Sequence, residues 1–314
     1  MSRRRAEAAR IAAWIARDLA AAPPRAKSLV VTVWGDALAP HGGSVWLSGL
    51  IRLLAPFGIN ERLVRTSVFR LAREGWLAAR QDGRRSRYRL TRQGLRRFEH
   101  AYRRIYAPPS ADDWDGSWQM LVAAPAGIEK AARSELRREL GWEGFGALAP
   151  GLLVRPARPE GKSPIAEILR AHRAEGGIAM FVARPAGRAG WAHAWVRQCW
   201  DLDAVAVEYR TFMRRFQTVV TEFARRDADA EQCFVVRTLL IHAFRRVTLH
   251  DPQLPPKLLP ARWPGPDAYA LCRDFYRLTH KRAEAHLASI LHTEGGGFPP
   301  AAAYFHQRFG GLRP

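Results

Sequence analysis

The chain has 314 residues, a mass of 35.3 kDa and a formal net charge of +21. This length suggests two or three packed modules, and a hydrophobic content of 47% argues against extended disorder. No apolar run reaches the ~18–20 residues that a membrane-spanning helix needs. The basic N-terminal stretch also lacks the continuous apolar core of a secretory signal. We therefore expect a cytoplasmic protein.

The positive charge gathers in the first third of the chain. Residues 1–107 contain 22 Lys and Arg against 7 Asp and Glu, a net charge of +15, whereas the rest of the chain carries +6. Arg supplies nearly all of this excess, and its planar guanidinium suits two-point contacts with phosphate or guanine. A genome rich in G and C would explain Arg in place of Lys, but not the asymmetry. The asymmetry favours nucleic-acid binding by the first third.

Cysteine usage and catalytic motifs point away from metal and enzyme chemistry. Cys199, Cys233 and Cys272 are odd in number and far apart, with no C-x-x-C pair, so we expect free buried thiols. The sequence contains no G-x-S-x-G, Walker or H-E-x-x-H motif. The glycines at 295–297 lack the preceding strand and following Lys of a phosphate-binding loop. We expect neither a metal nor a cofactor, and no enzymatic activity.

The first 54 residues predict two helical regions and one ambiguous segment. Residues 1–27 contain a basic amphipathic helix, about 4–21, before a proline break. Residues 28–39 have strand propensity, yet Ser28 as a cap and the spacing of the apolar residues allow a helix instead. A turn at 40–43 then precedes a helix over 46–54. Its expected apolar face is Trp46, Leu47, Leu50, Ile51 and Leu54.

The segment 61–74 predicts a helix with a basic outer face. Asn60 is placed as its N-cap, Ile59 as a hydrophobic staple, and Gly75 at its C-terminal end. The expected inward residues are Leu63 or Val64, Val68, Leu71 and Ala72. A short helix, a tight turn and a basic helix form the helix-turn-helix pattern, whose second helix enters the major groove. We expect DNA contacts from Arg62, Arg65, Thr66, Ser67, Phe69 and Arg70.

A basic hairpin follows this helix. Two strand-like segments, 76–80 and 86–90, flank a turn that contains Asp82 and Gly83, a strong hairpin signal. Arg84, Arg85 and Arg87 near its tip suit a wing that grips phosphate or probes the minor groove. Thr91 then caps a helix that runs to about residue 106. A basic, solvated surface on an unrelated helical domain would share the charge, but the order of elements favours a winged helix at 28–107.

The sequence at this point resembles the PaaX family, the repressors of phenylacetic acid catabolism. The resemblance rests on Gly58–Thr66, Leu71–Trp76 and Gly83–Leu90, and on a second block with Arg237–His242, Asp251–Pro255, Leu259-Pro260 and Trp263–Gly265. It covers about residues 28–290. Membership implies a dimeric repressor that an aryl-acyl-coenzyme A, typically phenylacetyl-coenzyme A, releases from its double-stranded operator DNA.

The middle of the chain, residues 112–190, predicts a ferredoxin-like domain after a linker at 107–113. The expected elements are a strand at 118–124, a helix at 127–140, strands at 145–148 and 151–155, a helix at 164–173 capped by Ser163, and a strand at 178–183. The family resemblance implies the same fold, similar to the small CRISPR-associated nucleases.

A nuclease of that kind needs carboxylates at its metal ion. The first strand of the middle domain ends in Val122-Ala123-Ala124-Pro125, without an acid. Asp112, Asp113 and Asp115 precede the strand, and we interpret them as solvated linker residues. A metal-dependent nucleic-acid enzyme therefore remains an alternative to the repressor, as does an architectural DNA binder without sequence preference.

Residues 191–314 predict an all-α domain, which makes the whole chain an α+β protein of three domains. Helices are expected within 191–220, 231–247 and 266–290, with Asp201 and Asp203 as caps and a proline-rich excursion at 249–265. The apolar faces of these helices are the expected dimer contact. An acyl-coenzyme A needs cations for its phosphates and an apolar slot for its acyl group. The candidates are His242, Arg245, Arg246 and Trp263, although a core histidine, a basic helix end and a packed tryptophan would show the same pattern.

Overall fold

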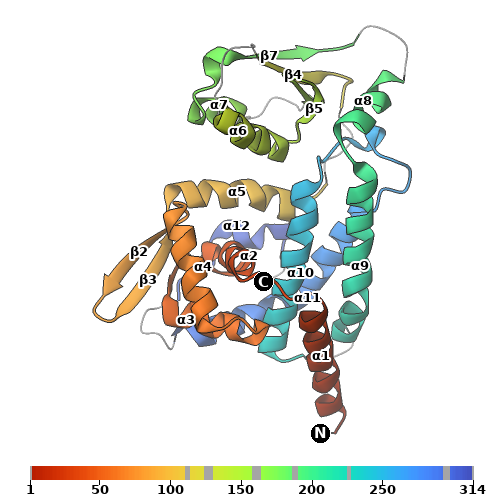
Figure 1. Cartoon of the computed structure of the whole chain (residues 1–314). Coiled ribbons are helices and arrows are strands. Elements are labelled where there is room, and N and C mark those ends of the chain that lie inside the picture. The colour runs from red at the N-terminus through yellow and green to blue at the C-terminus, as the bar shows by residue number, and fades with distance from the viewer. Residues whose placement is uncertain are drawn as a thin grey trace. The chain divides into compact units, whose positions relative to one another are not determined.

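The computed structural model describes residues 2–109, 114–123, 130–157, 164–185, 190–224, 228–292 and 298–312. The chain is a mixed helix and sheet protein with two small antiparallel sheets (Figure 1). Two compact units emerge from its contacts. The first comprises Met1–Pro108, Arg210–Arg246 and Asp267–Pro314, and the second comprises Pro109–Tyr209 and Val247–Pro266. Within the described part of the chain, no helix is both long and apolar enough to cross a bilayer.

The first unit begins with α1 (Ser2–Ala21) and α2 (Ala26–Val33), which a π-helical turn, Trp34–Leu38, continues. The ambiguous segment is therefore helical. Its β-branched residues still form a helix because every side chain from Leu29 to Val33 is buried there, and tertiary burial outweighs the weak local propensity. A 3-10 turn, Ala39–His41, and Gly42 with a φ of +84° complete the turn expected at this place.

The helix expected over 46–54 is shorter, and the expectation for Trp46 was wrong. Trp46 is the last residue of a three-residue strand, β1 (Ser44–Trp46), and α3 (Leu47–Leu54) begins after it. Trp46 has extended backbone angles and lies opposite Arg87 in the sheet. Helical spacing could not reveal this strand, because its pairing partner lies about forty residues further along the chain.

The helix α4 (Glu61–Arg73) and the hairpin of β2 (Leu77–Asp82) and β3 (Arg85–Leu90) follow the expected order. The Asn60 side chain accepts a hydrogen bond from the Leu63 backbone N–H at 2.9 Å, which confirms the predicted cap. The sheet order is β1-β3-β2, and the hairpin extends away from the helices around it (Figure 1). Thr91 caps α5 (Arg92–Tyr106), as expected, by accepting a hydrogen bond from Gly94.

The C-terminal helices α9 (Leu202–Ala224), α10 (Ala230–His250), α11 (Gly265–His292) and α12 (Ala303–His306) do not form a unit of their own. The boundaries of the two compact units therefore differ from those of the domains expected at residues 28–107 and 191–314. The reason is that α10 packs on the N-terminal elements: Phe234 meets Phe57 with ring centroids 6.0 Å apart. The N-terminal helix joins the same unit, since Arg215 of α9 donates to Asp18 at 2.6 Å.

A buried ionic cluster lies inside this first unit. Arg237 and Arg308, both 0% exposed, contact Asp36 at 3.3 and 3.1 Å, and Arg237 also donates to Glu284 at 2.8 Å. The Tyr276 hydroxyl donates to Asp36 at 2.9 Å. Burial alone would raise the pKa of Glu284, but Arg237 and a hydrogen bond from His41 lower it to about 2. The cluster ties the segment after α2 to α10, α11 and the C-terminal end.

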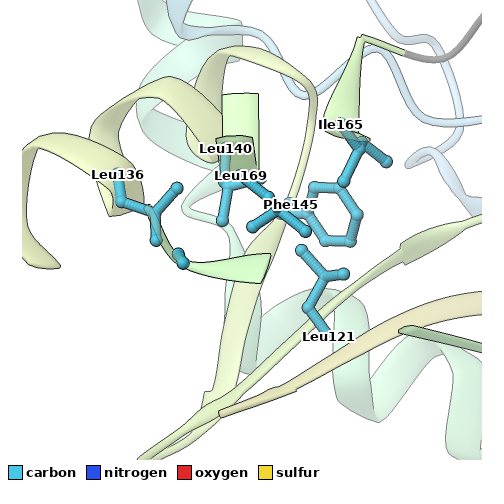
Figure 2. Packing of buried hydrophobic residues seen from close by; sticks show 7 residues of the cluster. Leu121, Leu136, Leu140, Phe145, Ile165 and Leu169 are labelled. Carbon is cyan, nitrogen blue, oxygen red and sulfur yellow. The ribbon is translucent and has the colours of Figure 1, made fainter. Parts of the chain in front are cut away.

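The second unit contains β4 (Trp118–Ala123), α6 (Lys130–Trp142), β5 (Gly146–Ala149), β6 (Leu152–Pro156), α7 (Ile165–Ala171) and β7 (Ile178–Ala183). The order of these elements is the expected one, and the sheet order is β5-β6-β4-β7. The cap residue Ser163, residues 124–129, and Asp112 and Asp113 lie outside the described residues. Figure 2 shows the core between the sheet and its two helices, formed by Leu121, Leu136, Leu140, Phe145, Ile165 and Leu169.

A second core covers the other face of this sheet. Trp118 is fully buried, and its ring lies 5.3 Å from that of Trp195 in α8 (Trp191–Cys199). Trp263, in the proline-rich excursion, packs against the same cluster. Asp201 accepts a hydrogen bond from the Ala204 backbone at 3.0 Å, so it caps α9 as predicted. The three cysteines are free thiols, as expected: two are buried and Cys199 is half-buried.

Candidate nucleic-acid interface

The outer face of α4 is the first part of the candidate interface. Val64, Val68 and Leu71 are buried, which turns the opposite side of the helix to solvent. Arg62 and Arg73 are exposed on that side, and between them the Phe69 side chain is 60% exposed. The helix therefore presents a ring flanked by guanidinium groups, a combination that suits base edges and phosphates.

Two residues expected to contact DNA from α4 behave differently in the structure. Ser67 is only 4% exposed and its hydroxyl donates to the Leu63 carbonyl at 2.7 Å, so its side chain faces the core and the prediction was wrong. Ser67 directly precedes the buried Val68. Because serine is small and polar, its residue type does not indicate whether the side chain faces the core or the solvent. Arg65 is exposed, but it pairs with Glu61 at 2.6 Å.

The remaining predicted residues of α4 stay at the surface. Thr66 is exposed, and its hydroxyl donates to the Arg62 carbonyl at 2.9 Å. Arg70 is exposed as well, and it makes no ion pair with any residue that the structure describes. The exposed predicted set on α4 is thus Arg62, Arg65, Thr66, Phe69 and Arg70.

One face of the small sheet is the second part of the candidate interface. Arg85, Arg87 and Arg89 alternate along β3, and Arg80 of β2 lies directly opposite Arg87. Like charges in directly opposed positions destabilise a sheet, so an anion laid across this face would relieve the repulsion. The arrangement favours a polyanionic partner.

Trp46 orders two of these arginines. The guanidinium carbons of Arg85 and Arg87 lie 4.5 and 5.7 Å from the centre of its ring, and Arg87 donates to the Ser44 hydroxyl at 2.8 Å. Stacking on an aromatic face fixes the plane of a guanidinium, so Trp46 holds both side chains in a defined orientation. Arg84 differs, because it is exposed at the turn of the hairpin. The preceding residue, Gly83, has a φ of +56°, a backbone conformation that glycine adopts more readily than other residues.

Three exposed arginines complete the surface but were absent from the predicted contacts. Arg73 lies on the outer face of α4, and Arg80 and Arg89 share the sheet face with Arg85 and Arg87. Strand alternation could have identified Arg80 and Arg89, since residues two apart point to the same side. Helical spacing could have identified Arg73, which follows Thr66 by seven positions, about two turns.

The four predicted effector residues have different surroundings, each within its own unit. His242 is buried, with its Nδ1 2.8 Å from the Thr32 hydroxyl, and burial together with Arg245 and Arg246 lowers its pKa to about 3. Arg245 donates to the Ser28 hydroxyl at 3.0 Å, and burial lowers its pKa to about 10. Arg246 is exposed, whereas Trp263 belongs to the second unit. Two of the four residues thus attach α10 to α2.

The described residues contain no cluster of His, Cys, Asp and Glu that could hold a metal ion. Asp115, one of the three acids near the first strand of the middle domain, accepts a hydrogen bond from the Ser117 backbone at 2.9 Å and pairs with Arg184. These hydrogen bonds lower its pKa to about 2. The carboxylate is therefore occupied in holding the start of β4.

The second unit contains a cavity of about 350 Å³ between α6 and the sheet. Its walls are mainly apolar, with Leu121, Leu140 and Ile178 among them. Arg133 and Arg137, which are exposed on α6, also line it. An apolar slot with cations at its border fits a ligand that has an apolar group and an anionic group.

Comparison with known proteins places these features in a family. Three family models match consecutive parts of the chain: a PaaX-like protein at residues 25–94, the PaaX protein central Cas2-like domain at 111–194, and the PaaX-like protein C-terminal domain at 200–289. The chain belongs to the PaaX family. The PaaX signature of the sequence, first indicated by the segments around Asn60 and Arg237, thus extends over nearly the whole chain.

Two relatives of this PaaX-family chain differ in how closely they match it. The transcriptional repressor PaaX of Escherichia coli (strain K12) is 36% identical over 301 residues, which cover 93% of this chain and 92% of the relative. The solved structure of the uncharacterized protein Rv0674 from Mycobacterium tuberculosis is 28% identical, with a TM-score of 0.51. That match covers 83% of this chain and 97% of the other.

Proposed function

We propose that the chain is a sequence-specific DNA-binding transcriptional repressor. In this proposal α3 and α4 form a helix-turn-helix, α4 enters the major groove, and the β2–β3 hairpin is the wing that contacts the flanking backbone. The observation that carries it is the set of exposed arginines on α4 beside Phe69 and on the small sheet around Trp46. Arg62, Arg70 and Arg73 of α4 have no acidic partner among the described residues. The E. coli relative, named as a transcriptional repressor, supports the same function.

Selection of bound duplexes from a randomised DNA pool tests this proposal. We expect enrichment of one palindromic motif, bound with a Kd of ~10⁻⁸–10⁻¹¹ M at physiological salt and weakened steeply by added salt. Equal affinity for all duplexes would instead identify an architectural DNA binder. Turnover of plasmid or RNA with Mg²⁺ would instead identify a nucleic-acid enzyme. The described residues contain no cluster of metal-binding side chains that favours this alternative.

The family resemblance further supports control of a phenylacetate-type catabolic operon by a dimer that an aryl-acyl-coenzyme A releases from DNA. We place the effector in the cavity of the second unit, with the aryl-acyl group against Leu121 and Leu140 and the phosphates near Arg133 and Arg137. Its volume lies within the ~300–1,000 Å³ of small-molecule sites.

Calorimetric titration with phenylacetyl-coenzyme A, coenzyme A and phenylacetate tests the effector and its site. Phenylacetyl-coenzyme A should bind most tightly, and Arg137→Ala should weaken it at least tenfold. Arg246→Ala is the matched control, because Arg246 is exposed on α10 in the other unit. Loss of binding in Arg246→Ala alone would favour the residues predicted from the sequence. Absence of binding by all three compounds would remove the effector proposal and leave DNA binding untouched.

A further inference from the structure

The outer face of α4 carries one large apolar ring among its arginines. Phe69 is 60% exposed, the highest exposure of any large apolar side chain described in the first unit. Among the described residues, no other ring and no guanidinium stacks on it. Val64, Val68 and Leu71 supply the core contacts of the helix from its opposite side. The fold therefore leaves most of the Phe69 ring in water, where its apolar surface adds nothing to stability.

Phe69 lies within a basic stripe of the helix. Arg62 precedes it by seven positions and Arg73 follows it by four, spacings that bring residues to nearly the same side of a helix. Both arginines are exposed, and neither has an acidic partner among the described residues. A guanidinium suits phosphate or guanine, whereas a phenyl ring has no hydrogen-bond donor for either. The ring therefore needs an apolar partner close to the groups that the arginines contact.

The major groove of DNA offers one such partner on its base edges. Every base pair presents hydrogen-bond donors and acceptors there, and the C5-methyl group of thymine is the one apolar group in that pattern. Phenylalanine is among the side chains that contact this methyl group. Cytosine carries a hydrogen at the same position, and both purines present the N7 acceptor. An apolar ring held against the base edges therefore distinguishes thymine from the other three bases without a hydrogen bond.

We infer that Phe69 is a specificity-determining residue, whose ring contacts the C5-methyl group of one thymine in each half of the DNA site. The inference rests on the proposed function, since it requires α4 to enter the major groove. It adds an apolar contact to the polar contacts of the neighbouring arginines. The duplexes that the chain selects should accordingly carry a T·A pair at one fixed position of each half-site.

Replacing single thymines by deoxyuridine tests the inference on the DNA side. Deoxyuridine pairs with adenine as thymine does and keeps its hydrogen-bonding groups, but it lacks the C5-methyl group. The duplex to use is the one selected by the unmodified chain, with each thymine replaced in turn and binding measured by fluorescence anisotropy. At one position of each half-site, loss of the methyl group should weaken binding by about fourfold, the contribution expected from one buried methyl group.

Three variants of the full chain test the inference on the protein side. Phe69→Ala should bind the thymine and deoxyuridine duplexes with equal affinity at that position, while Phe69→Leu, which keeps an apolar side chain, should retain part of the difference. Leu278→Ala is the matched control and should retain all of it, because that leucine is 47% exposed on α11, outside the candidate interface. Circular dichroism melting curves establish that each variant is folded.

The outcomes separate this inference from the repressor proposal. A methyl effect at one position of each half-site that disappears in Phe69→Ala would support it. If the unmodified chain were insensitive to every methyl group, the inference would be overturned, since the ring would then contact sugars or insert between bases. A methyl effect that persisted in Phe69→Ala would overturn it as well and assign the contact to another residue. Both results leave the repressor proposal intact, whereas equal affinity of the unmodified chain for all duplexes would overturn the two together.

Discussion

Arginine has opposite roles in two regions of the first unit. Arg237 and Arg308 are fully buried and contact Asp36, with Glu284 beside Arg237. The arginines of α4 and of the small sheet are exposed, and Arg62, Arg70 and Arg73 of α4 have no acidic partner among the described residues. The first group is balanced by an equal number of carboxylates, while the second leaves its charge for an external partner. Net charge alone would not distinguish the two groups.

The comparison shows why the basic N-terminal third needs the C-terminal helices. The balanced group connects Asp36, after α2, to α10, α11 and the C-terminal end, so it holds the elements that carry the exposed group. Burying such charges is costly unless each is paired, and removing one partner leaves the others uncompensated. The buried arginines position the basic surface and are not available to it.

Breaking the balanced group should have the largest effect. Asp36→Asn keeps the shape of the side chain but removes the charge that faces Arg237 and Arg308. We expect the free energy of unfolding to fall by ~3–5 kcal/mol, as measured by urea denaturation followed by circular dichroism. Glu61→Gln, which breaks the exposed pair with Arg65, is the control and should cost at most ~0.5 kcal/mol. Equal losses in the two variants would contradict the distinction between the regions.

Removing members of the exposed group should affect DNA binding without affecting stability. Arg70→Ala and Arg73→Ala should each weaken operator binding by ~1–3 kcal/mol and relax the preference for bases at the contacted positions. Arg65→Ala should also weaken binding, although its pairing with Glu61 offsets part of the loss. Fluorescence anisotropy with operator and scrambled duplexes measures both effects. If Arg65 and Arg70 substitutions left operator affinity unchanged, the assignment of α4 as recognition helix would fail.

The local elements were largely predictable from the sequence because their signals are local. The Asn60 and Thr91 caps, the Gly75 helix end and the hairpin turn at Gly83 each act within a few residues, and all appear as expected. The strand β1 and the compact units were not predictable in this way. They depend on Trp46 pairing with a distant strand and on Asp36 contacting Arg237, which no spacing rule reveals.

The candidate interface was predictable in outline but not in detail. Helical periodicity identified the exposed side of α4, yet it could not show that Ser67 turns inward or that Arg65 has a partner in Glu61. The sequence indicates the effector residues only by the closeness of charged and aromatic groups along the chain. The structure uses His242 and Arg245 to join α10 to α2, and this tertiary role has no signature in a single sequence.

His242 provides an intermediate test, because it is a buried base beside two arginines. Its pKa falls to about 3 in the folded chain, mainly through burial, against an ordinary value of 6.5. The folded state thus binds fewer protons, so its stability is complete above pH 6.5 and is lost as the pH falls toward 3. Between pH 7.5 and 5.5 we expect a loss of about 1.4 kcal/mol, measured by urea denaturation at each pH. In His242→Gln this pH-dependent loss of unfolding free energy should disappear. If the variant kept the same pH dependence as the unmodified chain, other titrating groups would be its cause.

Arg84→Ala should produce the smallest effect and sharpen the comparison within the exposed group itself. Arg84 lies at the tip of the hairpin, without the aromatic support that Trp46 gives Arg85 and Arg87. A contact of this kind neutralises a phosphate and carries no base preference, so binding to operator and scrambled duplexes should weaken alike, by up to ~1 kcal/mol. The slope of log K against log salt should become less negative by about 1. A loss confined to the operator would instead mean that the tip contacts bases, and the wing would then contribute to specificity as α4 does.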